Sequence, residues 1–248
     1  WKNRSTDGGD YTAMYNIINN YYKPGPVTSL KDPISYRILK PESGRSKLPY
    51  VVFGRAYVEG NIIEGNEKVT KDNWDGGVQV ENKKGELMTY EQAKPYFAAM
   101  RVKKPFPMAE MTILSTMDAH KYVLANVGAT LPKRDAVDAR VIEQVKTGKI
   151  TYPANVKLSD KPDFEHRRLP KDSYKQGIIT DVSQVGGYPE YKGTPYKDTD
   201  SDGMPDDYET KNGLDPKDAS DAAKITKGGY SNIEIYLNSV VPVKIVKP

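Results

Sequence analysis

Short runs of apolar residues, separated by glycine, proline and asparagine, make up much of residues 1–77. They occur at residues 13–15, 17–18, 50–53, 57–58 and 62–63. Apolar runs of this length with turn-forming residues between them are typical of β-strands. We therefore predict strands and turns over this part of the chain.

Two of these segments resemble each other. Residues 15–22 (YNIINNYY) and 56–63 (AYVEGNII) each have apolar residues, then an asparagine, then an apolar pair. The repeat is typical of successive coils of a parallel β-helix, in which stacked asparagines hydrogen-bond one another and the backbone. The alternative is a pair of ordinary antiparallel strands. Because a solenoid needs at least about three repeats and end caps, we predict that residues 1–88 are the last coils of a β-helix lying mostly outside this sequence.

Helical patterns follow in the middle of the chain. A helix over residues 89–100 begins with a capping box, and two more are predicted over about residues 116–127 and 135–148. The stretch 149–197 is rich in proline and irregular, which is typical of chain that wraps over a larger body. We therefore predict that residues 89–197 form a helical and extended segment packed on the β-helix.

The composition favours a secreted protein that is held together without disulfides. The 248 residues include no cysteine, and 37% of them are hydrophobic. No apolar run approaches the roughly 18 residues that span a bilayer, and the polar start Trp1-Lys2-Asn3 is no signal peptide. Such a chain depends on its core or on bound metal for stability. A cytosolic protein is the alternative that the absence of cysteine leaves open.

The charge is unevenly distributed. The chain carries a net charge of +4, but between Asp198 and Asp221 nine acidic residues face only Lys211 and Lys217, which gives −7 there and +11 elsewhere. A basic body with a separate acidic segment suits an acidic polymer and cations as partners. Because no basic run or nucleic-acid-binding motif is present, an acidic polysaccharide is favoured over nucleic acid.

Residues 198–209 (DTDSDGMPDDYE) match the calcium-loop pattern D-x-[DN]-x-[DN]-G-x5-E at every specified position. Alternate side chains of such a loop point inward, Gly203 permits the sharp turn, and the final glutamate supplies two oxygens. The predicted ligands are Asp198, Asp200, Asp202, the carbonyl of Met204, Asp206 (directly or through water) and Glu209. All are oxygen ligands, which favour Ca²⁺ over zinc or copper. The alternative, a solvated acidic turn, would leave clustered carboxylates to repel one another.

The predicted ion is structural, since nothing in the loop suggests a nucleophile or a base. Pro205 stands where a paired EF-hand has an aliphatic residue, so the loop is more similar to those of dockerins and thrombospondin type 3 repeats. Residues 224–235 have the outline of a second loop but lack its aspartates, and a capping box at 231–234 predicts a final helix. Residues 198–248 therefore form the predicted calcium loop and C-terminal helices.

Several stretches, taken in order, resemble Bacteroidetes pectate lyases of polysaccharide lyase family 1. They are residues 19–26 (NNYYKPGP), 57–61 (YVEGN), 70–74 (TKDNW), 124–129 (LANVGA), 134–140 (RDAVDAR), 186–190 (GGYPE), and the calcium loop with its tail at 213–216 (GLDP). The matches extend from one end of the chain to the other. The loop alone occurs in many secreted proteins, but the ordered set is much more specific.

The resemblance implies a right-handed parallel β-helix and a lyase that cleaves pectic polygalacturonan by β-elimination. In that chemistry calcium neutralises the uronate carboxylate and an arginine removes the proton at C5. The resemblance also implies that the catalytic arginine and the catalytic calcium site precede Trp1. The chain is therefore expected to be the C-terminal part of the enzyme, inactive by itself and partnered by the upstream portion.

Arg4, Lys23 and Arg55 are the candidate substrate-binding cations, because they lie nearest the predicted strand edges. Solvated turn charges are the alternative for all three. The expected location is outside the cytoplasm of a bacterium, as a secreted, periplasmic or outer-surface protein. Two other functions remain open: a calcium-stabilised carbohydrate-binding or surface-attachment module, and a lyase-like protein that has lost activity.

Overall fold

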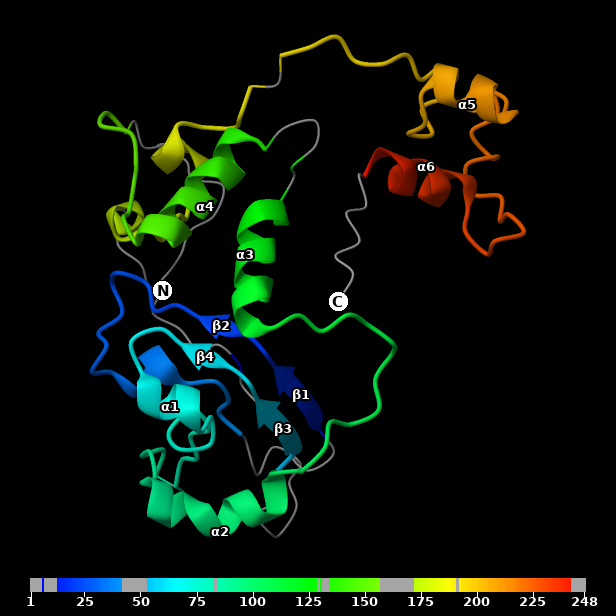
Figure 1. Cartoon of the computed structure of the whole chain (residues 1–248). Helices are drawn as coiled ribbons and strands as arrows, with labels where there is room; N and C mark the ends of the chain where they lie inside the picture. Colours follow the sequence, from blue (N-terminus) through cyan, green and yellow to red (C-terminus); the bar gives the residue numbers. More distant parts are fainter. Residues whose placement is uncertain are drawn as a thin grey trace. The chain divides into compact units, whose positions relative to one another are not determined.

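A computed structural model describes residues 6, 13–41, 53–82, 84–128, 130, 134–156, 172–190 and 192–241. The chain divides into two compact units, Trp1–Tyr188 and Pro189–Pro248. The described strands and helices α1 to α4 belong to the first unit, and helices α5 and α6 belong to the second (Figure 1). The predicted segments 1–88 and 89–197 thus fall almost entirely within one unit, and the predicted calcium loop falls in the other.

Two pairs of short parallel strands lie at the centre of the first unit (Figure 1). The strands are β1 (Met14–Ile18), β2 (Tyr21–Tyr22), β3 (Arg55–Glu59) and β4 (Ile62–Ile63). β1 pairs with β3 so that Tyr15 lies beside Ala56, and β2 pairs with β4 so that Tyr22 lies beside Ile63. The register therefore places the strand residues of segment 15–22 opposite the equivalent residues of segment 56–63, as in the sequence alignment of the two segments. The antiparallel alternative is therefore wrong for these strands.

Further parallel contacts lie beside these strand pairs. Leu39 forms a parallel bridge with Val78, at nearly the same sequence interval as the strand pairs. Beyond β3, Ala56 forms a parallel bridge with Arg101, and the Val102 N–H donates to the Ala56 carbonyl at 3.0 Å. Three separate stretches of chain therefore stack in the same direction beside one another.

A row of three hydrogen-bonded asparagines joins the first two of these stretches at the bend after β1 and β3; Asn61 and Asn73 are buried, and Asn20 is exposed. The Asn20 side chain donates through Nδ2 to Oδ1 of Asn61, 41 residues further on, at 2.9 Å. Asn61 in turn donates through Nδ2 to Oδ1 of Asn73 at 3.0 Å and to the Ile17 carbonyl at 2.8 Å. The Asn73 Nδ2 donates to the Asn61 carbonyl at 2.8 Å. The bond between Asn20 and Asn61 is the contact between asparagines that the repeat predicted.

The hydrophobic core lies on the inner side of the stacked chain. Side chains along β3 alternate, so Ala56 and Val58 are buried whereas Arg55 and Glu59 are exposed. The core comprises Ile38, Leu39, Ala56, Val58, Ile63, Val69, Trp74, Val78, Val80, Ala93, Phe97 and Met100. Burial of these side chains is the main favourable term for the unit.

Helix α2 (Tyr90–Met100) supplies part of that core. Its predicted capping box is confirmed: the Gln92 N–H donates to Thr89 Oγ1, and Gln92 Oε1 accepts from the Thr89 N–H at 2.9 Å. The Phe97 ring packs edge-on against buried Trp74, with ring centroids 5.2 Å apart. The helix is therefore integral to the first unit instead of merely covering its strands.

The two other predicted helices are confirmed as α3 and α4. The remaining helices of the described first unit are α1 (Glu67–Lys71), α3 (Thr116–Asn126) and α4 (Ala136–Thr147), with 3-10 turns at Pro33–Tyr36, Ser173–Gln176 and Val182–Val185. Asp135 caps α4 by accepting from the Asp138 N–H at 2.8 Å, and Gly148 ends it in a left-handed conformation. α1 packs on β4, and α3 packs on β2 (Figure 1).

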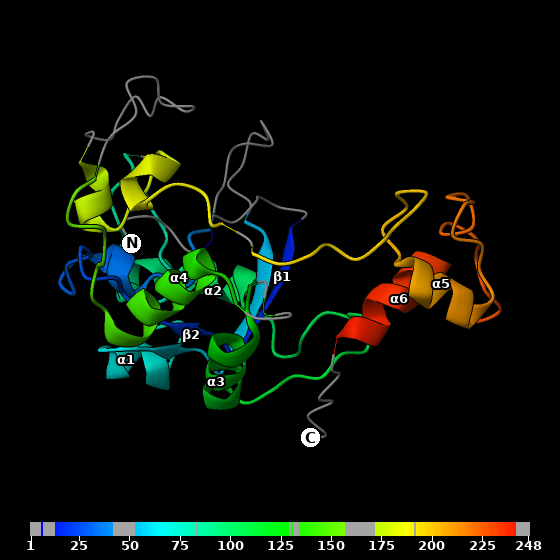
Figure 2. The same ribbon diagram turned by 90° about the horizontal axis from the view of Figure 1, so that it is seen from above.

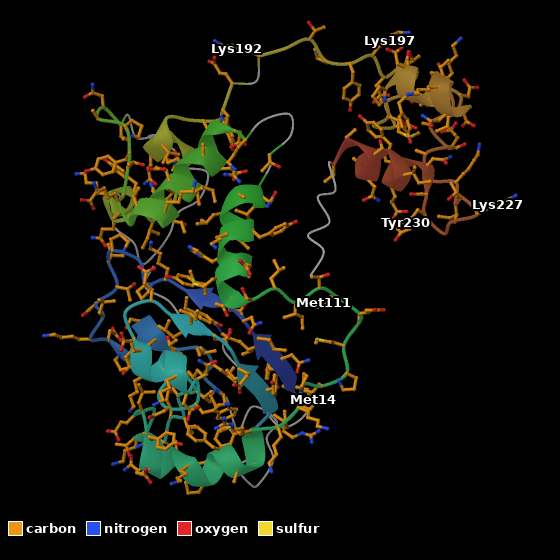
Figure 3. The ribbon with its side chains drawn as sticks, in the orientation of Figure 1. Met14, Met111, Lys192, Lys197, Lys227 and Tyr230 are labelled. Atoms are coloured by element: carbon orange, nitrogen blue, oxygen red, sulfur yellow. The ribbon has the colours of Figure 1, made fainter. Side chains whose placement is uncertain are left out.

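Between α2 and α3 the chain runs past β1 without forming a helix or strand. The Asn16 side chain donates to the Phe106 carbonyl at 3.0 Å and accepts from the Phe106 N–H at 2.9 Å. The Asn19 side chain donates to the Leu114 carbonyl at 2.9 Å. Figure 3 labels Met14 on β1 and Met111 on this connection, and both side chains are exposed.

The second unit consists of two short helices and the turns around them. α5 (Asp206–Asn212) and α6 (Asn232–Val240) lie side by side in both Figure 1 and Figure 2. The Tyr208 and Tyr236 rings meet between them, with centroids 4.7 Å apart. The capping box predicted at the start of α6 is confirmed. In the part of the chain that the structure describes, no helix is both long and apolar enough to cross a bilayer.

We predict that Asn61→Leu lowers the free energy of unfolding of the chain by about 3 kcal/mol or more, because its buried partners would lose their hydrogen bonds. Urea denaturation followed by tryptophan fluorescence measures the loss. Asn20→Leu is the matched control, since Asn20 is exposed at the end of the row, and it should cost about 1 kcal/mol or less. Equal losses in the two variants would contradict a structural role for the buried row.

Candidate metal centre

Three aspartates come from the loop that precedes α5. The loop turns sharply because Ser201 and Gly203 have left-handed φ angles of 61° and 99°. The Gly203 N–H donates to Oδ2 of Asp198 at 3.0 Å, and the Met204 N–H donates to Oδ1 of Asp202 at 2.7 Å. These bonds fix two carboxylates and leave the second oxygen of each for another partner.

Helix α5 brings Glu209 to the loop. The helix begins with Asp206 and Asp207, whose negative charges suit its N-terminal end. Its Glu209 N–H donates to the Pro205 carbonyl at 3.0 Å, and Gly213 ends the helix with φ 73°. The Glu209 side chain is fully buried, with 0% of its surface exposed.

A fifth carboxylate, Asp221, comes from the turn that follows α5. It is 4% exposed, and its Oδ2 accepts from the Asp215 N–H at 2.9 Å. The loop pattern ends at Glu209, so the sequence motif did not include Asp221. The available signal is the run of acidic residues up to position 221, which indicates a local negative charge but does not identify a ligand.

The five carboxylates form two overlapping groups. Asp198, Asp200 and Asp202 make one group, and Asp202, Glu209 and Asp221 make the other. Within each group, one oxygen of every carboxylate lies within 4.8 Å of the others. Oxygens on opposite sides of a bound Ca²⁺ are about 5 Å apart, so this spacing fits a cation of that size.

Seven carboxylate oxygens in the cluster are buried and have no hydrogen-bond partner among the described residues. They are Asp198 Oδ1, both oxygens of Asp200, Asp202 Oδ2, both oxygens of Glu209, and Asp221 Oδ1. A buried carboxylate oxygen without a partner is costly. A bound cation would be a suitable partner for these oxygens, because Ca²⁺ takes six to eight oxygen ligands.

The electrostatics of the cluster agree with this. Burial, followed by the charges of Asp200 and Asp202, raises the pKa of Glu209 to about 7. Burial, followed by the charges of Asp202 and Asp198, also raises the pKa of Asp200. Two nearby lysines form ion pairs with carboxylates outside the cluster: Lys197 pairs with Asp206, and Lys224 pairs with Asp218.

Asp206 lies outside both carboxylate groups of the described residues, and its role as a ligand, directly or through water, stays a prediction. Asp206 Oδ1 accepts from the Thr199 N–H, and its Oδ2 accepts from the Thr199 hydroxyl and Lys197, each at 2.8 Å. The Lys197 ammonium lowers the pKa of Asp206. Asp206 therefore fixes the start of the loop. Met204 lies in the loop with its side chain fully buried, and the role of its carbonyl as a ligand stays a prediction.

The candidate substrate-binding cations have separate surroundings. Exposed Arg55 opens β3 and stacks over the Phe106 ring, 5.5 Å from its centroid. Lys23 follows β2 at the other end of the strand pairs, where its Nζ lies 3.7 Å from Glu64 and donates to the Lys146 carbonyl at 3.3 Å. Arg4 lies outside the described residues. The structure therefore does not gather the two described cations into one cluster, and their role stays a prediction.

Comparison with known proteins finds similarity to fungal pectate lyases over nearly the whole chain. A protein of Emericella nidulans named "Probable pectate lyase C" is 32% identical over 239 residues, which are 95% of this chain and 45% of that protein. Proteins of the same name from Aspergillus flavus and Aspergillus fumigatus are 29% and 28% identical, again over 95% of this chain and over 44% and 46% of their own lengths.

The chain thus spans about half the length of the curated relatives it matches. No protein-family model matches it. The similarity is to pectate lyases, as the sequence resemblance predicted, although these relatives are fungal and the Bacteroidetes origin stays a prediction.

We predict that Asp202→Asn has opposite effects with and without a divalent cation. In chelator it should slow hydrogen exchange of α5 roughly 5- to 30-fold, because it removes a charge from a cluster of like charges. With cation it should speed exchange relative to the wild type, because a ligand is weakened. Hydrogen exchange measured by mass spectrometry of peptides from α5 checks both directions.

Asp207→Asn is the matched control, since Asp207 is exposed and lies outside both carboxylate groups. It should change exchange little in either condition. If Asp202→Asn behaved like Asp207→Asn, the repulsion within the cluster would not matter to stability.

Proposed function

We propose that this chain is part of a secreted pectate lyase and that its first unit consists of coils of a right-handed parallel β-helix. The observation that carries the proposal is the similarity to pectate lyases across 95% of the chain. The parallel pairing of similar segments, the third parallel contact at Leu39 and Val78, and the row of asparagines support the fold. A solenoid stacks such repeats at a nearly constant interval.

The proposed substrate is polygalacturonate, the acidic backbone of pectin. Outside residues 198–221 the chain carries a net charge of +11, which favours a polyanionic partner. Exposed Arg55 and partly buried Lys23, together with Arg4, are the proposed contacts to uronate carboxylates. The proposed reaction is β-elimination, in which a base removes the proton at C5 and the glycosidic bond at C4 breaks.

The catalytic arginine and catalytic calcium site are proposed to lie in an upstream portion of the same enzyme. The similarity covers about 45% of the relatives' length, but that share does not say which part of them this chain matches. The C-terminal placement therefore rests on the sequence resemblance alone. A position outside the cell is proposed because pectin is found there, and the bacterial periplasm or surface likewise rests on the resemblance.

The proposed metal is Ca²⁺, bound by Asp198, Asp200, Asp202 and Glu209. Among the described residues, the cluster offers seven unpartnered oxygens and no nitrogen or sulfur ligand, which favours a hard cation with many oxygen ligands. Mg²⁺ is less suitable, because it prefers six ligands and retains several waters. Bound calcium would offset the carboxylate charges and so stabilise the second unit.

We predict that the chain binds calcium and that Asp200→Ala with Asp202→Ala abolishes binding. At a free calcium concentration 100 times Kd, the second unit of the wild type should gain about 2.7 kcal/mol in free energy of unfolding. Isothermal titration calorimetry gives Kd, and hydrogen exchange of α5 gives the stabilisation. Equal stability of wild type and variant in calcium and in chelator would contradict a structural ion.

We predict that the full-length gene product degrades polygalacturonate and that this chain alone does not. Cleavage by elimination leaves an unsaturated uronate, whose ultraviolet absorbance is recorded over time. Binding of polygalacturonate to the chain without any activity of the full-length protein would favour the carbohydrate-binding module instead. Activity of the chain alone would contradict the upstream location of the catalytic residues.

A further inference from the structure

We propose that Asp221 is a cation ligand from outside the twelve-residue loop, and that cation binding at Asp221 fixes residues 213–241, including helix α6, against the loop. The proposal rests on the proposed calcium site. It adds a ligand that the loop pattern lacks and a structural consequence for the remainder of the second unit.

One carboxylate oxygen of Asp221 accepts a hydrogen bond, and the other has no partner among the described residues. Its Oδ2 accepts from the Asp215 N–H at 2.9 Å, and its backbone N–H donates to the Asp218 carbonyl at 2.9 Å. Its Oδ1 is buried without a partner among the described residues and belongs to the group formed with Asp202 and Glu209. Without a cation, the buried oxygen would be repelled by the two other carboxylates of its group. A cation bound between them would stabilise this arrangement.

The first turn of α6 is hydrogen-bonded to the backbone around Asp221. The Asn232 side chain donates through Nδ2 to the Asp221 carbonyl at 2.9 Å, and the Ile233 N–H donates to the Ala222 carbonyl at 3.1 Å. The Asn232 N–H donates to the Lys224 carbonyl at 3.2 Å. Three hydrogen bonds therefore connect the start of α6 to the chain segment that Asp221 anchors.

The same turn of α6 lies against the loop and α5. The Ile233 Cδ1 atom is 3.6 Å from the position that a Cβ atom on Gly203 would occupy. One turn further, Tyr236 meets Tyr208 of α5 with ring centroids 4.7 Å apart. Figure 1 and Figure 2 both show α6 alongside α5. The position of α6 thus depends on how residues 198–222 are held.

Helix α6 has few other sources of stability. It spans nine residues, and isolated helices shorter than about 12 residues are marginal in water. Ile235, Leu237 and Val240 are exposed, at 39%, 52% and 46% of their surface, so its apolar side chains contribute little burial. Its capping box stabilises only the first turn. Without a cation, repulsion between Asp221 and its neighbours would release the segment on which the helix rests.

The experiment measures calcium affinity and the order of α6 separately, on the full chain. Calorimetry with CaCl₂ gives Kd, and hydrogen exchange by mass spectrometry follows peptides covering residues 198–212, 232–240 and 55–63. The last peptide lies in the first unit and reports on its folding. Matched samples with NaCl at equal ionic strength separate binding from screening.

In the wild type, calcium should slow exchange in residues 232–240 about tenfold or more. Asp221→Asn should weaken calcium binding roughly 10- to 100-fold, and at saturating calcium it should restore protection to residues 198–212 more than to 232–240. Asp218→Asn is the matched control, because Asp218 pairs with Lys224 and lies outside the cluster. It should resemble the wild type in both measurements.

A second variant separates the two parts of the proposal. Asn232→Ala removes the bond to the Asp221 carbonyl without changing a carboxylate. It should retain calcium affinity within about threefold, since no ligand charge changes, and lose part of the calcium-dependent protection of 232–240. This result does not depend on whether Asp221→Asn folds normally.

The outcomes distinguish failure of this proposal from failure of the calcium site. If the wild type bound no calcium, the site itself would be wrong. If the wild type bound calcium, but Asp221→Asn bound it equally well and α6 exchanged at the same rate with and without calcium, the site would stand and the role of Asp221 would be overturned.

Discussion

Asn61 is fully buried, and each polar atom of its side chain finds a partner within the chain. Buried polar atoms must be paired, because an unpaired amide in a dry interior costs more than a hydrogen bond returns. In the first unit this constraint is met by stacking β3 on β1, which aligns Asn20 with Asn61, and by Asn73, 12 residues further along the chain, which bonds to Asn61. A one-residue slip of β3 against β1 would separate Asn61 from Asn20 and turn Ala56 and Val58 out of the core.

The second unit is subject to the same constraint but meets it differently. Five carboxylates converge, and seven of their oxygens have no partner among the described residues. The bonds made by Gly203, Met204 and the Asp215 N–H hold these carboxylates in place without neutralising them. In our proposal the missing charge comes from calcium. On this proposal an ion from solution would stabilise the second unit, whereas hydrogen bonds between amides within the chain stabilise the first.

Under the proposed function, this division suits a secreted protein whose sequence holds no cysteine. A unit of about 60 residues has a small core, and disulfides or metal ions commonly supply the stability that such a core lacks. The second unit, Pro189–Pro248, has that size, and the buried hydrophobic residues that it contributes are few, with Met204 and Ala222 among them. Under the proposed function, abundant extracellular calcium would keep this unit folded while the first unit belongs to the polysaccharide-binding body.

The sequence by itself determined the local features of this protein. The capping boxes at Thr89 and Ser231 and the pairing of the matching segments 15–22 and 56–63 were predicted correctly, because each depends on residues close together in the chain or on a repeated pattern. Only the tertiary structure decided that Asp221 joins the carboxylate cluster while Asp206 bonds to Lys197 and Thr199 instead. Such choices depend on which groups folding brings within hydrogen-bonding distance, and a sequence pattern that specifies spacing along the chain does not contain that information.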